Sequence, residues 1–191
     1  MYSLKDYFFP NLKEEDIKKL KFKFSHYDNH IYFMENNEIL IDIIKYAKYM
    51  SQPDSFMRIG KEMGKILKER SLKADLIAFV PMYRKDEIKR GFNQSFLLAK
   101  EISKSTNIPL TKKALKKTRK THHQASLSKG LRAINLQGAF IAFDQIVAGK
   151  RVILVDDIFT SGATLKECEK ELLKNQAKQV IFITIAKVLE K

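Results

Sequence analysis

The fold is decided by the sequence RVILVDDIFTSGAT, residues 151–164. Its apolar run, residues 152–155, has the length and β-branched content of a strand buried inside a parallel sheet. Two adjacent carboxylates, Asp156 and Asp157, follow this run and precede a turn rich in hydroxyl groups. A helix is predicted after the turn, over residues 162–175. A buried strand, a short polar turn and a helix in this order are typical of a parallel α/β fold.

The turn after the two acids contains the groups that an anion site requires. Gly162 lets the backbone approach an anion closely. Thr160, Ser161 and Thr164 offer hydroxyls, and the amides of the helix N-terminus favour a phosphate. The alternative is an ordinary strand-to-helix turn, with Thr160 or Ser161 as the N-cap and Asp156 as a loop acid. One residue suffices for a cap, and two adjacent like charges repel unless a ligand uses them, so a ribose-phosphate site is favoured.

The whole stretch resembles the phosphoribosyl-diphosphate (PRPP) signature of type I phosphoribosyltransferases: a hydrophobic strand, two acids, then Thr-Ser-Gly-Ala-Thr. In that family the acids hold the ribose hydroxyls and the turn holds the 5′-phosphate. The resemblance therefore implies that Asp156 and Asp157 are the ribose-binding and catalytic acids. It also implies that the phosphate is held by Thr160, Ser161, Gly162, Ala163 and Thr164. The signature is specific for PRPP binding but not for catalysis, because some regulators with this fold bind PRPP without converting it.

The rest of the chain fits one such domain. Its 191 residues, 45% of them hydrophobic, suffice for one domain with a core. We expect an α/β core over residues 51–191, with a mostly parallel sheet flanked by helices, and an N-terminal lid over residues 1–50. The core strands are predicted at 74–81, 109–114, 139–143, 152–157 and 180–188, and the core helices at 95–105, 127–134 and 162–175. The N-terminal part is predicted to form a hairpin at 21–34 and helices at 38–50 and 55–70, the last capped by Ser55.

Charge is distributed unevenly along the chain. The net charge is +14, yet residues 102–143 contain nine Lys or Arg and no Asp or Glu. Such a segment is typical of contact with a phosphate backbone or a polyphosphate; a solvated lysine-rich face is the alternative. The candidate contacts are Lys112, Lys113, Lys116, Lys117, Arg119, Lys120, Lys129 and Arg132.

Cysteine and hydropathy patterns indicate the compartment. The single cysteine, Cys168, is predicted to be a buried core thiol, and one cysteine cannot form a four-cysteine zinc site. No apolar stretch has the roughly 18 residues of a membrane span, and the first residues lack the apolar region of a signal peptide. We therefore expect a cytoplasmic protein without membrane insertion.

A second motif follows the predicted strand at 74–81. The loop after it contains Tyr83, Arg84, Lys85 and Arg90, followed by Gly-Phe-Asn-Gln. Because the carboxyl ends of parallel strands meet at one edge of a sheet, these four side chains are predicted to bind pyrophosphate beside the two acids. The alternative is that the glycine makes a turn and the asparagine caps the next helix.

Four ordered motifs resemble the ComF (competence protein F, ComFC) family: Arg-Gly-Phe-Asn-Gln at 90–94, Gln-Ala-Ser-Leu-Ser at 124–128, Gly-Ala-Phe at 138–140, and the PRPP signature. The resemblance covers residues 44–188, and Lys48-Tyr49 matches a Lys-Tyr/Phe element of the family. It implies a bacterial cytoplasmic protein that handles incoming single-stranded DNA during natural transformation. Many members begin with a four-cysteine zinc module. This chain has no cysteine before Cys168, so no zinc is expected.

The resemblance implies a set of ligands and partners. These are PRPP with Mg²⁺, single-stranded DNA held by the basic residues named above, and other competence or DNA-processing proteins. Aromatic candidates for base stacking are Tyr83, Phe92 and Phe96, the last with a core position as its alternative. An active phosphoribosyltransferase of nucleotide salvage or modification is the alternative function, and nothing in the sequence identifies a pocket for its acceptor base.

Overall fold

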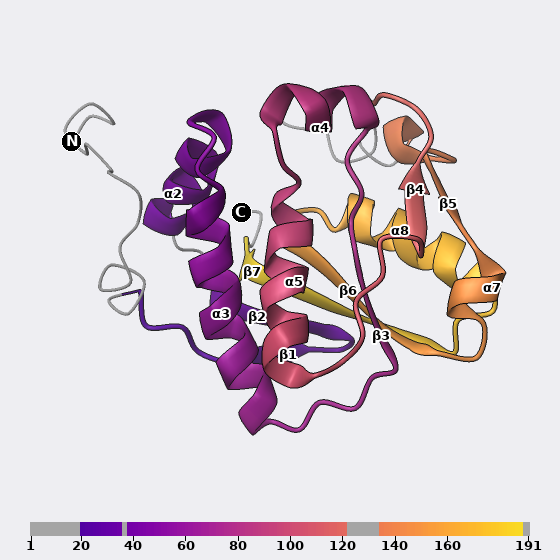
Figure 1. Cartoon of the computed structure of the whole chain (residues 1–191), viewed down its shortest axis with the longest axis horizontal. Coiled ribbons are helices and arrows are strands. Elements are labelled where there is room, and N and C mark those ends of the chain that lie inside the picture. The colour runs from indigo at the N-terminus through magenta and orange to yellow at the C-terminus, as the bar shows by residue number, and fades with distance from the viewer. Residues whose placement is uncertain (1–19, 36–37, 122–133, 189–191) are drawn as a thin grey trace.

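The computed structural model describes residues 20–35, 38–121 and 134–188 (Figure 1). Its central sheet has five strands in the order β1-β2-β7-β6-β3. All neighbouring pairs are parallel except β1 and β2, which are antiparallel. The strands are β1 (Ser25–Tyr27), β2 (His30–Glu35), β3 (Leu76–Phe79), β6 (Arg151–Phe159) and β7 (Gln179–Lys187). The predicted α/β class, with a mostly parallel sheet flanked by helices, is confirmed.

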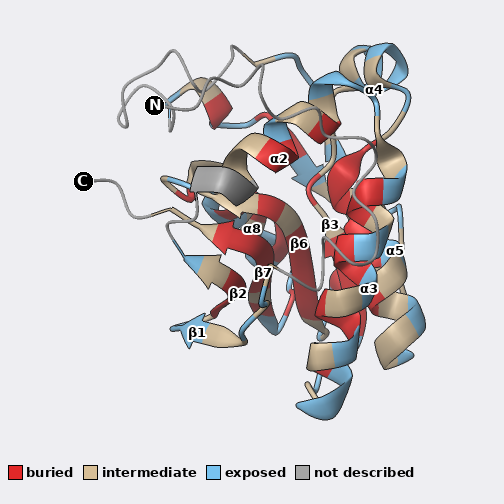
Figure 2. Cartoon of the chain, turned by 90° about the vertical axis from the view of Figure 1, so that its left-hand side faces the viewer, coloured by how far each residue is buried: buried red, intermediate tan, exposed pale blue. Residues whose placement is uncertain are grey.

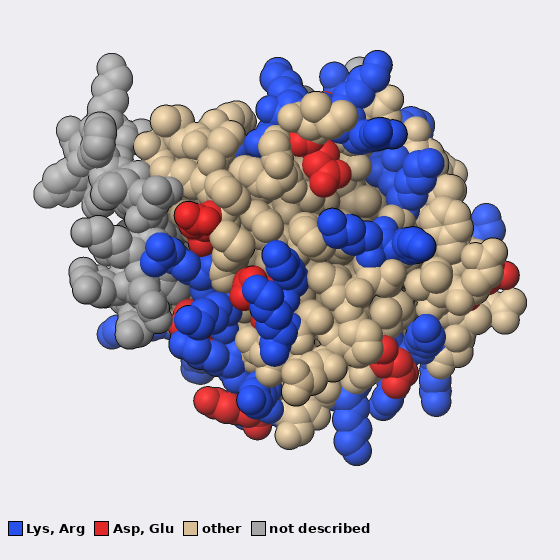
Figure 3. Space-filling view, in the orientation of Figure 1, with Lys and Arg blue, Asp and Glu red and all other residues tan. Residues whose placement is uncertain are grey.

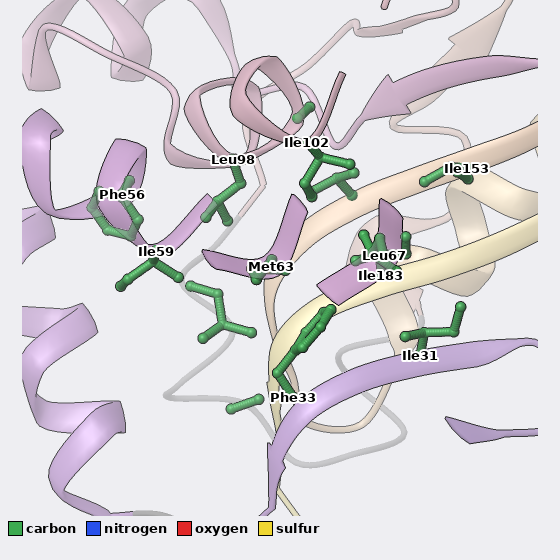
Figure 4. Close-up of a cluster of buried hydrophobic side chains, with 14 of the residues drawn as sticks. Ile31, Phe33, Phe56, Ile59, Met63, Leu67, Leu98, Ile102, Ile153 and Ile183 are labelled. Carbon is green, nitrogen blue, oxygen red and sulfur yellow. The ribbon is translucent and has the colours of Figure 1, made fainter. Parts of the chain in front are cut away.

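One face of the sheet is covered by two closely packed helices, α3 (Pro53–Glu69) and α5 (Gln94–Thr106). They approach closely because α3 presents glycines to α5: a Cβ added at Gly60 would lie 3.0 Å from the Leu98 backbone. Beneath them, apolar side chains from both helices meet those of β2, β6 and β7 (Figure 4). Large side chains such as Phe33 and Met63 are fully buried there. This core fixes the helix α5 whose first turn reaches the site.

The other face is covered by α8 (Ala163–Lys174), whose buried side chains pack on β6 and β7. Cys168 is a free, fully buried thiol in this layer, as predicted. A second sheet of two strands, β4 (Leu115–Lys117) and β5 (Phe140–Ala142), lies beside α8. Figure 2 shows buried residues concentrated in the sheet and on the inner sides of the helices.

The N-terminal hairpin differs from the prediction of a lid. It does turn at Asp28, whose φ is +54°, but β2 also pairs in parallel with β7 and so becomes a strand of the central sheet. Residues 30–33 are all buried, so both faces of this strand are covered. The sequence predicts a hairpin here but does not show whether that hairpin lies at the periphery or joins the central sheet. Among the described residues of the predicted lid, only α2 (Glu38–Tyr49) borders the site.

Four further features differ from expectation. Residues 109–114 do not form a strand; Leu110 makes one parallel bridge to Ile77, and the strand begins at Leu115. The predicted loop after β3 contains a helix, α4 (Arg84–Arg90), and a short helix α7 (Asp144–Val147) follows β5. Gln52, not Ser55, precedes α3 because Pro53 occupies its first turn. The predicted helix at 127–134 falls almost entirely outside the described residues.

In the described ranges, none of the helices is long and apolar enough to cross a membrane.

Candidate functional site

The carboxyl ends of β3 and β6 open into one cavity of about 900 Å³. Most of its lining comes from three segments: α2, residues 80–86 after β3, and residues 156–165 at the end of β6 and the start of α8. Gln94, Lys117 and Val188 also line it. Figure 1 shows these ends of β3 and β6 with α4 above them and α8 behind. Parallel α/β sheets bind ligands at this edge, so the cavity is the candidate site.

The two acids are the last polar residues of a strand rather than part of a loop, because β6 continues to Phe159. Asp156 accepts hydrogen bonds at Oδ1 from the Ser95 hydroxyl, at 2.7 Å, and from the backbone N–H of Asp157, at 2.9 Å. Asp157 is buried and forms an ion pair with Lys48 of α2. The carboxylates are thus held by two different helices, α5 and α2.

Burial raises the pKa of Asp156 to about 7, and the neighbouring charge of Asp157 acts in the same direction. The hydrogen bond from Ser95 and the charge of Lys48 lower it only in part. Asp156 is therefore predicted to exchange a proton near neutral pH, unlike ordinary exposed carboxyls.

The turn after the acids requires glycine for two reasons. Gly162 has a φ of +72°, which side chains with a Cβ rarely adopt, and a Cβ there would lie 2.4 Å from Cζ of Phe159. Gly162 precedes α8, and no side chain caps that helix at this position. Of the five residues predicted to hold the phosphate, Thr160, Gly162, Ala163 and Thr164 line the cavity. Ser161 is not part of the lining, and its hydroxyl accepts a 3.5 Å hydrogen bond from the Ala163 N–H.

The predicted pyrophosphate residues are not all at the cavity. Tyr83, the residue before α4, lines it, but Arg84 lines a smaller neighbouring cavity. Lys85 is exposed on α4. Arg90 is engaged elsewhere, because its guanidinium donates to Gln94 Oε1 at 2.9 Å and lies 3.7 Å from the sulfur of Met82. Arg90 therefore links the end of α4 to the first residue of α5, Gln94, in this structure.

Most of the basic segment is displayed to solvent. Lys112, Lys113, Lys116 and Lys120 are exposed, and Lys129 and Arg132 lie outside the described residues. Arg119 donates to the backbone carbonyls of Asn135 and Gln137, at 3.0 and 2.8 Å, and so ties two segments together.

Among the basic residues of this segment that the structure describes, Lys117 is the exception, because it lines the larger cavity. Its ammonium donates to Thr121 Oγ1 at 2.9 Å. Burial lowers the pKa of Lys117, although the carboxylates of Asp86 and Asp156 partly oppose this. A residue predicted to bind DNA thus stands at the candidate PRPP site.

Several cavity residues were not assigned from the sequence. Lys45 and Asp42 of α2 line the cavity together with Gln94, and Ser95 holds Asp156. Two lining residues had a sequence signal: Lys48 lies in the Lys-Tyr element, and Gln94 ends the Arg-Gly-Phe-Asn-Gln motif. Asn93 is a helix cap, the alternative considered for it: its side chain accepts from the N–H groups of Ser95 and Phe96 at the start of α5.

The described residues of the cavity do not include the group of carboxylates that a metal ion held by protein ligands alone would need. No group of three or more His, Cys, Asp or Glu suited to a metal occurs within residues 20–35, 38–121 and 134–188. The acid pair fits Mg²⁺ that is held mainly through a polyphosphate ligand, since this ion keeps few protein ligands.

A mostly parallel sheet in which one strand ends in an acid pair, followed by a glycine turn and the N-terminus of a helix, is the architecture of a phosphoribosyltransferase-type domain. The model of the phosphoribosyl transferase domain family matches residues 93–191, and the chain belongs to this family. The match begins at Asn93 and so includes α5 with Ser95, both acids and the turn.

Sequence comparison supports the resemblance to the ComF family. The chain is 38% identical over 106 residues to DNA utilization protein YhgH of Escherichia coli, which is 56% of this chain and 46% of that protein. It is 35% identical over 103 residues to Competence protein F of Haemophilus influenzae, covering 53% and 45%. The matches therefore span about half the length of these relatives.

Among solved structures, the chain is similar to the allosteric regulatory enzyme of purine biosynthesis, at 26% identity and a TM-score of 0.47, over 66% of this chain and 25% of that one.

Proposed function

We propose that the chain binds PRPP together with Mg²⁺ in the cavity at the ends of β3 and β6. The observation that carries the proposal is the placement of Asp156, Asp157 and the N-terminus of α8 around one cavity of about 900 Å³. Carboxylates accept hydrogen bonds from sugar hydroxyls, and a helix N-terminus attracts phosphate. One cavity thus offers binding groups for both the ribose and the phosphate of a ribose-phosphate.

The remaining lining residues suit the diphosphate. Lys117 and Lys48 bring ammonium groups to the cavity and Tyr83 a hydroxyl. Mg²⁺ would be held by the diphosphate with Asp156 or Asp157 nearby, and would supply charge neutralisation of that group. A ribose that reaches Asp157 competes with Lys48 for its carboxylate, which would release this ammonium toward the phosphates.

Thermal shift measures this binding directly. Saturation to about 100 times the dissociation constant stabilises a protein by about 2.7 kcal/mol, which for a chain of this size raises Tm by roughly 5 to 10 °C. We expect that rise with PRPP and Mg²⁺ for the wild type and for Asp54→Asn, an exposed acid on α3. Asp157→Asn should lose most of it. An unchanged Tm of the wild type would exclude the PRPP site.

We further propose that the chain acts in natural transformation by binding single-stranded DNA. The names of its relatives, DNA utilization protein and Competence protein F, support a role in DNA uptake. Charge supports it as well: Lys and Arg gather over α4 at the top of the view in Figure 3, and Lys112, Lys113 and Lys116 are exposed nearby on and before β4.

Binding of labelled oligonucleotides at several salt concentrations tests the DNA proposal. Affinity should fall steeply with salt, with a slope of about 0.7 per phosphate contact on a logarithmic scale. Removing charge at Lys112, Lys113 and Lys116 together should weaken binding and flatten this slope. A triple variant that binds DNA as tightly as the wild type would refute the role of this segment.

Catalysis is a second candidate function, favoured by one observation. The pKa of Asp156, raised to about 7 by burial, matches what a general base needs at neutral pH. Release of pyrophosphate from PRPP in the presence of nucleobases, and its loss in Asp156→Asn, would establish transferase activity. PRPP binding without pyrophosphate release would assign the site to ligand sensing.

A further inference from the structure

A second, smaller cavity lies on the other side of the segment that follows β3. Its volume is about 270 Å³, and its walls come from the end of β3, α4, the first turn of α5 and β4. It shares Pro81, Met82 and Lys117 with the larger cavity. The two cavities therefore flank one short stretch of chain, and Lys117 borders both.

Aromatic rings form part of its wall. Phe79 and Phe96 lie with ring centroids 5.2 Å apart and planes tilted by 58°. Phe96 is half-buried and is not part of either hydrophobic core, while Phe92, the neighbouring candidate for base stacking, packs against Phe56 inside one of them. Of the two phenylalanine candidates for base stacking, Phe92 and Phe96, only Phe96 therefore lines a cavity.

The cavity is also strongly basic. Its lining includes Arg84, Lys112, Lys116 and Lys117, against one acid, Glu87. The Lys112 ammonium lies 4.0 Å from the centre of the Phe96 ring, a cation–π contact. Lys112 is exposed on a flexible stem, so its ammonium can leave the ring and pair with an anion while the ring accepts a new neighbour.

We infer that this smaller cavity is a base-binding subsite for single-stranded DNA, in which one nucleobase stacks on Phe96 and the adjoining phosphates pair with Lys112, Lys116 and Arg84. The inference rests on the DNA binding proposed above. The volume, just below the roughly 300 Å³ of the smallest drug-sized pockets, suits one base rather than a whole nucleotide. Every base has a π-face, so such a site binds without strong sequence preference.

The position of the subsite gives it a second property. Because Lys117 borders both cavities, a phosphate of the bound strand and the diphosphate in the larger cavity would compete for or share this ammonium. PRPP and single-stranded DNA should therefore affect each other's affinity, and by linkage the effect must be the same in both directions.

The test compares an oligothymidylate with an abasic strand of the same length by fluorescence anisotropy. Removing the ring in Phe96→Leu should weaken oligothymidylate binding by about 5- to 100-fold, the usual effect of one stacked base, and leave abasic binding unchanged. Phe96→Tyr should bind as the wild type does. Tyr49→Leu, which removes an exposed aromatic outside both cavities, is the matched control.

A second measurement uses the unmodified chain. A strand carrying 5-iodouracil, crosslinked by light, should label the tryptic peptides 74–84 and 91–100, which contain Phe79 and Phe96. Labels only in other peptides, or equal loss of both strands in Phe96→Leu, would overturn the subsite. A wild type that binds neither strand would refute the DNA-binding proposal itself. The PRPP-induced rise in Tm of Phe96→Leu reports whether that variant is folded.

Discussion

The ends of β3 and β6 lie side by side at one edge of the sheet, yet they are built in opposite ways. At the end of β6, the acids are fixed by Ser95 and Lys48, and Asp157 is only 5% exposed. At the end of β3, α4 has no buried residue, and its cations Arg84, Lys85 and Lys89 are exposed, whereas Arg90 is bonded to Gln94. The first region has preformed geometry suited to one small ligand, whereas the second supplies charge that is mostly exposed. Substitutions in the first should therefore change stability and ligand binding together, and substitutions in the second only the binding of polyanions.

The largest effect is expected at Gly162. In Gly162→Ala the φ of +72° costs about 1 to 2 kcal/mol, and the clash of Cβ with the Phe159 ring costs a further 1 to 3 kcal/mol or so. We expect a loss of about 2 to 5 kcal/mol in urea unfolding, together with loss of PRPP binding. Gly149→Ala is the matched control, because Gly149 has a φ of +70° and nothing within 4 Å of its added Cβ. Equal losses in the two variants would show that the Phe159 contact has no energetic role.

Lys48→Met should come next. It leaves the buried carboxylate of Asp157 without its cation, a change that costs about 3 to 5 kcal/mol in a fully buried pair. Since the Lys48 side chain is 24% exposed, we expect a smaller loss of about 1 to 3 kcal/mol at neutral pH. Lys45→Met, also on α2 but 61% exposed and paired with Asp42, should cost less than about 0.5 kcal/mol. If Lys48→Met unfolds at the same urea concentration as the wild type, α2 does not stabilise the acid pair.

The pH dependence of stability should distinguish Asp156 from ordinary carboxyls. The folded pKa of Asp156, about 7, is above its ordinary value of 3.8, so the folded state binds more protons between these values. Its contribution to stability is thus present below pH 3.8 and is lost as the pH rises toward 7. Asp156→Asn should remove this decline in urea unfolding measured from pH 4 to 7.

Asp75, at the opposite end of the same sheet, provides the control of opposite sign. Hydrogen bonds from Arg151 lower the pKa of Asp75 to about 2, so its contribution is present above pH 3.8 and is lost only as the pH falls toward 2. Asp75→Asn should leave the slope between pH 4 and 7 unchanged. A decline that persists in Asp156→Asn would assign the titration to another group.

The two strand ends also differ in how far the sequence predicts them. The strand, the acids and the turn at 151–164 were predicted because their signal is local: a buried apolar run followed at once by polar groups. Their partners could not be predicted in the same way. Ser95 lies 61 residues from Asp156, and only the packing of α5 on the sheet brings it there. The place of β2 in the central sheet could not be predicted for the same reason, because its parallel partner β7 lies near the other end of the chain.

At the end of β3, the sequence shows which residues are cationic but does not predict which groups each side chain contacts. Arg90 and Gln94 are four residues apart and bonded to each other, although α4 ends between them at Gly91, whose φ is +86°. Lys117 points into the cavity because β4 pairs with β5, a strand from a distant segment. Side-chain direction in these places depends on tertiary contacts, which neither composition nor spacing contains.

The smallest effect on stability, and the sharpest contrast with Gly162, is expected on α4. Lys85 and Lys89 are exposed, so the double substitution by Gln should change the free energy of unfolding by less than about 0.5 kcal/mol. Single-stranded DNA should nevertheless bind more weakly, with the salt slope reduced by about 0.7 for each phosphate that the variant no longer neutralises. Substituting Lys170 and Lys178, exposed lysines on and after α8, removes the same charge far from α4 and should alter the slope less. Equal slopes for the two double variants would mean that net charge alone governs DNA binding, and that α4 is no more a binding surface than any other lysine-bearing face.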